Sequence, residues 1–191
     1  MKIGIIVGST REARVTPKFA KFIQNEANKY EGVEASLIDL KDYPMPFFEE
    51  SISPQYNPDR KPSAQVKKFL DEVKKYDSFV FVTPEYNRSY SAVLKNALDS
   101  LGHELNRKAV LLASHGSTGG AQAVAHLRAV VPGLGAVSTP KAVMLNFTTL
   151  ADINDDGSLN ADAMENPYGP IGALKPALDD LVWFTESLRE K

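Results

Sequence analysis

Three short polar loops hold the side chains of this chain that could take part in binding or catalysis. Each follows an apolar run, and the loops comprise residues 8–16, 84–88 and 114–120. The first offers hydroxyl groups, two arginines and backbone N–H groups at the start of a predicted helix, a combination that binds phosphate monoesters. It lacks both the Gly-Lys-Ser/Thr of a P-loop and the GxGxxG of a dinucleotide site. The alternative interpretation is an ordinary capped turn with solvated arginines.

The second loop has the groups that a flat heterocycle needs. Tyr86 presents an aromatic face, and Asn87 donates and accepts hydrogen bonds with one planar amide. The alternative is a rigid proline-type turn that carries surface side chains.

The third loop is rich in glycine. Glycines at positions 116, 119 and 120 allow the backbone to approach a ligand closely, and Ser114, His115 and Ser117 are candidate polar contacts. Glycine-rich strand ends are common, so this loop gains meaning only if it lies beside the other two.

Five apolar runs alternate with helical patterns and position these loops. The expected strands are residues 3–7, 33–40, 79–82, 109–113 and 142–145. Thr16, Ser63 and Ser91 are expected helix N-caps, and Gly102 is the expected stop of the third helix. A last helix is expected over residues 174–188. This alternation predicts an α/β fold, a three-layer doubly wound sheet of five parallel strands.

The strand order decides whether the loops meet. With five strands, the order 2-1-3-4-5 fits better than a six-stranded Rossmann sheet. That order places the switch point between strands one and three, so the first two loops should face each other there. Residues 1–191 are expected to form one domain, because no linker or repeat interrupts the chain.

Composition narrows the possible classes of protein. The 191 residues include no cysteine, so redox chemistry would need a cofactor. The net charge of −2, without a block of like charges, argues against nucleic acid and membrane surfaces as partners. No apolar stretch reaches transmembrane length or resembles a signal peptide. We therefore expect a cytoplasmic protein.

Four motifs together resemble a known family. They are GSTR at 8–11, PEYN at 84–87, LKNALD at 94–99 and SHGSTGG at 114–120. In this order and spacing the chain resembles the NAD(P)H-dependent FMN reductases, which include quinone and azo-dye reductases with a flavodoxin-like fold. The likeness extends over about residues 1–147.

The resemblance implies a set of cofactor-binding residues. The implied phosphate contacts are Ser9, Arg11, Arg14, Val15 and Thr16; the implied contacts of the isoalloxazine ring are Pro84, Glu85, Tyr86 and Asn87, mostly through backbone groups, with Ser114, His115 and Gly116 from the third loop. Relatives often have Ser and Asn after the first arginine, whereas this chain has Arg14, Val15, Thr16 and Pro17, so Arg14 is expected to replace a polar phosphate contact. At residues 90–92, many relatives have a Pro-Gly pair that this chain lacks.

The resemblance also implies a reaction. NADPH or NADH would pass a hydride to N5 of FMN in a ping-pong cycle, and a small acceptor such as a quinone, flavin or azo compound would then receive it. No catalytic side chain and no metal are expected, and assembly as a homodimer or homotetramer is implied. Two alternatives stay open: a flavodoxin-type electron carrier, and a flavin-binding interaction protein with incidental reductase activity.

Two segments have no assigned role at this stage. Residues 42–62 are rich in proline, acid and aromatics and are expected to form a surface loop or a lid. Residues 152–157 match the first half of an EF-hand loop, but the twelfth position is Ala163 rather than glutamate, so a polar turn is favoured.

Overall fold

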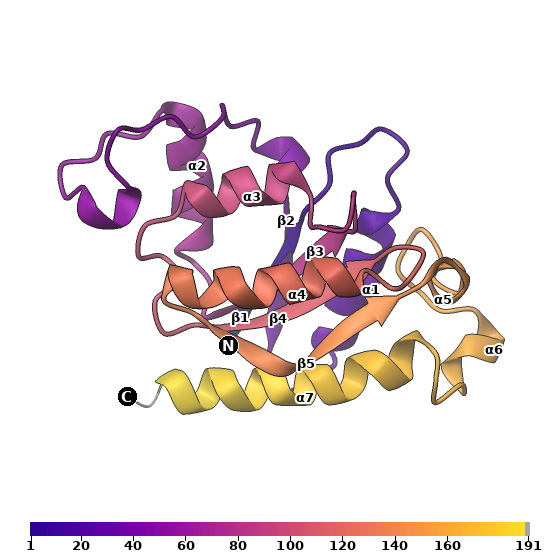
Figure 1. Cartoon of the computed structure of the whole chain (residues 1–191). Coiled ribbons are helices and arrows are strands. Elements are labelled where there is room, and N and C mark those ends of the chain that lie inside the picture. The colour runs from indigo at the N-terminus through magenta and orange to yellow at the C-terminus, as the bar shows by residue number, and fades with distance from the viewer. Residues whose placement is uncertain (190–191) are drawn as a thin grey trace.

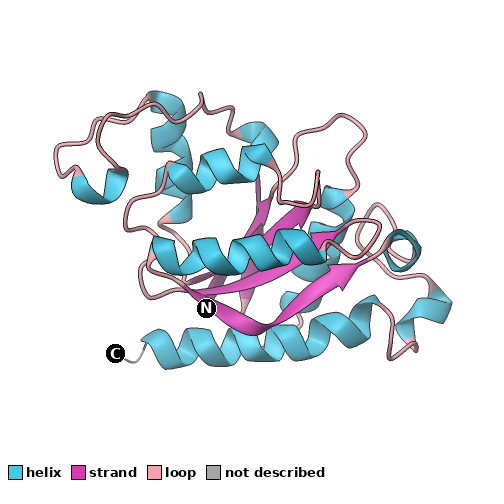
Figure 2. Ribbon diagram, in the orientation of Figure 1, coloured by secondary structure: helices cyan, strands magenta, loops and turns pink. Residues whose placement is uncertain are grey.

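A five-stranded parallel sheet organises the chain, as seen in a computed structural model that describes residues 1–189. The last two residues of the predicted 1–191 domain lie outside the described part. The strands are β1 (Lys2–Val7), β2 (Glu34–Asp39), β3 (Ser78–Pro84), β4 (Ala109–His115) and β5 (Val137–Leu145). Their order, β2-β1-β3-β4-β5, confirms the predicted 2-1-3-4-5 arrangement (Figures 1 and 2).

Helices cover both faces of the sheet. The helices are α1 (Thr16–Ala27), α2 (Ala64–Val73), α3 (Ala92–Asp99), α4 (Ala121–Val130), α5 (Phe147–Ala151), α6 (Ala161–Met164) and α7 (Pro170–Arg189). Side chains of α1 and α7 share one core cluster with one face of the sheet, and those of α2, α3 and α4 share the other (Figure 1). These are the three predicted layers.

The sequence pattern of the central strands explains this layering. Every residue of β3 and of β4 is buried, since each strand is covered above and below. In β1, Ile5 joins the core on the α1 side and Ile6 joins the core on the α3 side. A continuous apolar run therefore gives a doubly covered strand.

Two of the predicted helix caps are confirmed, and two predicted helix ends are displaced. The Ser63 hydroxyl accepts a hydrogen bond from the Val66 N–H, and the Ser91 hydroxyl accepts one from the Leu94 N–H. Both serines are therefore confirmed as N-caps. Thr16 is the first residue of α1, and Val15 occupies the cap position without a side-chain hydrogen bond. The expected stop at Gly102 was also displaced, because α3 ends at Asp99 with Ser100 as its C-cap.

The last strand of the sheet, β5, is longer than predicted. The expected strand at 142–145 begins at Val137, and its pairing with β4 is irregular between Val110 and Leu112. Exposed and buried residues follow one another irregularly along this edge strand. The sequence therefore shows an apolar run only in the second half of β5. The short helices α5 and α6 carry too few residues to show a helical period.

Residues 42–62 form an irregular surface segment with a short 3-10 turn at Pro54–Tyr56. Asn96 of α3 fastens the segment, because its amide donates to the Pro46 carbonyl (2.8 Å) and accepts from the Phe48 N–H (2.8 Å). This arrangement assigns the asparagine of the LKNALD motif a structural role.

A second contact fastens the other half of the same segment. Arg60 forms an ion pair with Glu50 (2.7 Å) and donates to the Ser100 carbonyl (2.8 Å) at the end of α3. The segment is therefore anchored at two points.

The acidic turn after α5 docks onto the outer side of α1. Lys18 donates to the Ile153 carbonyl (2.7 Å), Lys21 to the Asp155 carbonyl (2.9 Å), and Asn25 to the carbonyl of residue 156 (3.1 Å). These three donors recur at helical spacing, so one face of α1 contacts the turn along its length. The Ser158 carbonyl, which stands at the backbone-ligand position of an EF-hand loop, accepts from the Asn154 N–H (2.8 Å).

Two further findings concern the described residues, 1–189. No group of three or more His, Cys, Asp or Glu side chains gathers there as a metal-ion site. None of the helices in this part combines the length and the apolar content needed to cross a membrane.

Gly157 should be the least replaceable residue of the acidic turn. Its φ is +84°, and a Cβ placed there would lie 2.6 Å from the backbone of Lys21 and Phe22. We expect Gly157→Ala to lower the free energy of unfolding by about 3 kcal/mol, since strain and a backbone clash combine. Denaturant unfolding measures this loss.

Gly32→Ala is the matched control. Gly32 also has a positive φ, +72°, but nothing lies within 4 Å of the added Cβ. Its loss should be about 1 kcal/mol, the penalty of the left-handed conformation alone. Equal losses in the two variants would contradict the docking of the turn on α1.

Candidate functional site

The carboxyl ends of β1, β3 and β4 bring the three predicted loops together around a cleft of about 350 Å³. The cleft is lined by Arg11, Ala13, Arg14, Val15, Thr16, Pro84, Glu85, Tyr86, His115, Gly116, Ser117 and Phe147. Of the predicted site residues, Ser9, Asn87 and Ser114 are absent from this lining. No residue of the 42–62 segment lines it either.

The first and second loops face each other across the switch point, as predicted. The hydroxyl groups of Ser9 and Tyr86 lie 3.2 Å apart, and the guanidinium carbon of Arg11 lies 5.5 Å from the centre of the Tyr86 ring. Ser9 is buried, whereas Arg11 is exposed. Arg11 is therefore the basic side chain at this end that is available to a ligand.

The PEYN loop ends in a tight two-residue turn. Tyr86 and Ser89 exchange backbone hydrogen bonds of 2.8 and 3.0 Å, and Asn87 and Arg88 have positive φ values of 48° and 67°. These are the features of a type I′ turn. The turn places the exposed Asn87 at its tip, beyond the residues that line the cleft.

Glu85 caps a distant helix. Its Oε2 accepts hydrogen bonds from the backbone N–H groups of Gln122 (2.9 Å) and Ala123 (3.4 Å). The residue before α4 is Gly120, which has no side chain to cap the helix, so Glu85 fills that role from another loop. The carboxylate is thereby engaged within the protein.

Ser114 is buried and holds the third loop in shape. Its Oγ lies 2.8 and 3.0 Å from the carbonyl oxygens of Gly119 and Gly120. Gly116 closes against the second loop, since a Cβ added to it would lie 3.2 Å from the Cβ of Glu85. The second and third loops are thus packed in contact.

His115 is the last residue of β4, and only 6% of it is exposed. Its Nε2 lies 2.9 Å from the Thr16 hydroxyl, and its ring meets Phe19 edge-on, with centres 6.4 Å apart. Burial lowers the pKa of His115 to about 4, so the ring is neutral at pH 7. His115 is therefore a buried residue at the end of a strand rather than an exposed loop histidine.

Arg14 forms a bidentate ion pair with Asp39, at 2.6 Å for each Nη. Its Nη1 also donates to the Ser9 carbonyl. The guanidinium lines the cleft, but its hydrogen bonds are made to Asp39 and Ser9 of the protein itself.

Two residues at the site were not predicted. Asp39 ends β2, and Phe147 follows the end of β5, so both lie at the same edge of the sheet as the three loops. The rule that selected the loops, position at the carboxyl end of a parallel strand, applies to these residues as well.

The cleft combines donors for a phosphate with apolar surface for a flat ring. The start of α1 has no side-chain cap, so its backbone N–H groups are available to an anion beside Arg11. Val15 and Phe147, 40% and 63% exposed, supply apolar surface beside Tyr86. These residues fit FMN, which carries a phosphate and a flat ring system.

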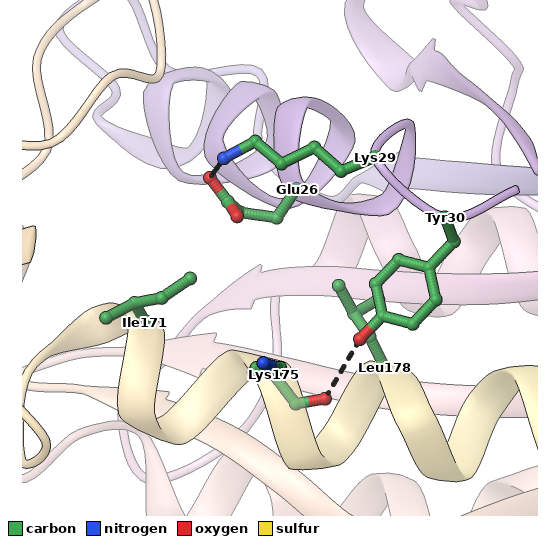
Figure 3. A pocket seen from close by; sticks show the side chains of 6 residues that line it. All are labelled: Glu26, Lys29, Tyr30, Ile171, Lys175 and Leu178. Carbon is green, nitrogen blue, oxygen red and sulfur yellow. Dashed lines mark hydrogen bonds and ion pairs between the residues drawn. The ribbon is translucent and has the colours of Figure 1, made fainter.

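A second hollow, of about 390 Å³, lies between α1 and α7 (Figure 3). Its polar groups are largely paired: Lys29 with Glu26 at 2.6 Å, and the Tyr30 hydroxyl with Asp179 at 2.7 Å. It shares no lining residue with the cleft and touches none of the strand ends. We interpret it as a crevice between packed helices.

Comparisons with known proteins show the family of this chain. The model of a family described as NADPH-dependent FMN reductase matches residues 1–149. An NAD(P)H-dependent FMN reductase of Schizosaccharomyces pombe is 36% identical over 129 residues, which cover 68% of this chain and 64% of that protein. An NADPH azoreductase of a Bacillus species is 32% identical over 178 residues, 92% of this chain and 91% of that protein.

A solved structure supports the fold. The flavoenzyme NAD(P)H:(acceptor) oxidoreductase FerB from Paracoccus denitrificans superimposes with a TM-score of 0.69 at 22% identity, over 99% of this chain and 97% of that one. At this identity the likeness concerns the fold alone.

His115 should make the stability of the protein depend on pH. Its pKa is about 4 in the folded state and about 6.5 when unfolded, so the unfolded chain binds the proton more readily between these values. The contribution of neutral His115 to stability is fully present above pH 6.5. The free energy of unfolding should fall by up to about 3 kcal/mol as the pH drops to 4.

Denaturant unfolding from pH 4 to 7 measures this loss. The variant His115→Gln, which has no titrating ring, should lose less stability over the same range, while His103→Gln at an exposed position should follow the wild type. Parallel curves for the wild type and His115→Gln would contradict the burial of a neutral imidazole.

Proposed function

The chain belongs to the NADPH-dependent FMN reductase family, and we propose that it transfers a hydride from NADPH or NADH to a small flat acceptor in two half-reactions at one cleft. The enzyme is an oxidoreductase with FMN as its cofactor and NADPH or NADH as its co-substrate. Acceptors of the quinone, flavin or azo class suit the site, and the Bacillus relative is named for azo reduction. The observation that supports this proposal most is that one cleft at the switch point combines the exposed Arg11 and the uncapped start of α1 with apolar side chains.

Bound FMN supplies the hydride-carrying chemistry that the side chains of this chain lack. The phosphate end is proposed to consist of Arg11 and the uncapped start of α1 at Val15 and Thr16. A cationic side chain beside oriented N–H groups favours a dianionic phosphate and orients the molecule that carries it.

Backbone groups of the second and third loops are proposed to meet the ring. Within residues 1–189, the N–H groups of Ser117 and Thr118 donate no hydrogen bond to the protein. N–H donors placed at the polar edge of a flavin stabilise the negative charge that reduction adds there. The neutral ring of His115, held by Thr16, adds no charge of its own beside this edge.

The remaining cleft residues shape access. Val15 and Phe147 present apolar surface at the rim, which favours flat apolar molecules and keeps water away from the reacting atoms. Glu85 and Ser114 hold the second and third loops. We accordingly expect no single side chain whose removal abolishes turnover.

Self-association is part of the proposal. Phe47 and Tyr56 are 81% and 79% exposed on the anchored 42–62 segment, away from the cleft. Large apolar side chains on an ordered surface favour contact with another protein surface. A homodimer or homotetramer is the expected assembly, and sedimentation showing a monomer at micromolar concentration would contradict it.

The direct test uses the purified protein with FMN. It should be yellow and should oxidise NADPH or NADH with a quinone as acceptor. A protein that takes up no FMN would overturn the proposal, and one that binds FMN without oxidising either nucleotide would favour an electron carrier.

Arg11→Ala tests the phosphate end. Loss of one charge-assisted contact should weaken FMN binding about tenfold, measured by quenching of flavin fluorescence. Because Arg11 is exposed, the melting temperature should not change. Lys61→Ala, which removes an equal charge from the surface away from the cleft, should leave FMN binding unchanged.

A further inference from the structure

Arg14 and Asp39 join the first loop to the end of β2. Both Nη groups of Arg14 contact the Asp39 carboxylate at 2.6 Å, in the parallel two-bond geometry that is the strongest arginine–carboxylate contact. The side chains are 12% and 23% exposed, so water screens this pair only in part. The pair is therefore a firm attachment rather than a passing surface contact.

The same two residues also bind backbone groups on both sides. Arg14 donates to the Ser9 carbonyl, which closes residues 9–14 into a ring through one side chain. Asp39 accepts from the Lys41 N–H at 3.0 Å, where a short 3-10 turn begins. The shape of the first loop is thus set by contacts that come from β2.

The hydrogen-bond capacity of Arg14 limits what else it can do. A guanidinium has five N–H donors, and three of these are used by Asp39 and Ser9. If Arg14 turned fully towards a phosphate, Asp39 would keep a largely buried charge without its partner, which is strongly unfavourable. Arg11, on the same loop, is exposed and has no such commitment.

We infer that the Arg14–Asp39 pair is a positioning device that gives the first loop its phosphate-binding shape, and that through it Asp39 helps the site to select a phosphorylated flavin over riboflavin. The inference rests on the proposed function, because it assumes that FMN binds in the cleft. It replaces the expectation that Arg14 serves mainly as a phosphate contact.

Two conservative variants and their combination test the inference. Arg14→Lys keeps the positive charge but cannot form two parallel bonds, and Asp39→Asn keeps the shape but removes the negative charge. Dissociation constants for FMN and for riboflavin are measured by quenching of flavin fluorescence. Each single variant should bind FMN about tenfold more weakly, the usual scale for outer partners of a binding site. The double variant should lose no more than the single variants, and riboflavin binding should stay unchanged.

A direct contact between Arg14 and the phosphate predicts a different pattern of FMN affinities. If Arg14 acts mainly as a phosphate ligand, Asp39→Asn would bind FMN as well as or better than the wild type, because the arginine is released towards the ligand. That result would overturn the inference. A parallel loss of FMN and riboflavin binding would also overturn it, since the pair would then support the fold in general.

Trypsin supplies a readout that needs no flavin. Arg11 and Arg14 are cleavage sites within the first loop, and loosening the loop should speed cleavage after Arg11 in Asp39→Asn. Unchanged cleavage would contradict the positioning role. If the wild type binds no FMN, the proposed function fails, whereas a wild type that binds FMN alongside unaffected variants refutes only this inference.

Discussion

The burial of β3 along its whole length is the constraint on which the site depends. All seven residues of this strand are covered by helices and neighbouring strands, so its polar contacts are confined to its carboxyl end. There the Ser91 hydroxyl donates to the Gly8 carbonyl at 2.5 Å and also caps α3. One small buried side chain thereby links the first loop to the helix that follows the second. The two loops meet because both are tied to the same strand end, where the Gly8 N–H donates to the Val82 carbonyl of β3 at 2.7 Å.

Most polar side chains at this edge of the sheet form hydrogen bonds or ion pairs with other groups of the protein. Glu85 caps α4, Ser114 holds the third loop, and Arg14 pairs with Asp39. Polar groups that a buried backbone leaves without partners are unfavourable, so nearby side chains satisfy them before any ligand arrives. What remains for a ligand is mainly backbone N–H groups and the exposed Arg11. A cofactor that supplies its own chemistry needs little more from the protein.

Sequence patterns predicted the features that depend on neighbouring residues. The alternation of apolar runs and helical stripes predicted the strand order, and Ser63 and Ser91 were recognised as caps because the capping residue lies three positions before its donor. Contacts between distant segments carry no such local signal. The capping of α4 by Glu85 spans 37 residues, and the Arg14–Asp39 pair spans 25. The position of the site was therefore predictable, whereas the division of its side chains between structural and binding roles was not.

The docking of the acidic turn on α1 shows that the folded unit continues beyond the residues that the family model matches. The family model ends at residue 149, yet the turn that follows is bound along the helix whose first residue lines the cleft. Leu174 and Leu178 of α7 also belong to the same core as β1. The last quarter of the chain thus supports α1 from its outer side. Divergence in that quarter among relatives can alter the site without changing any residue that touches the ligand.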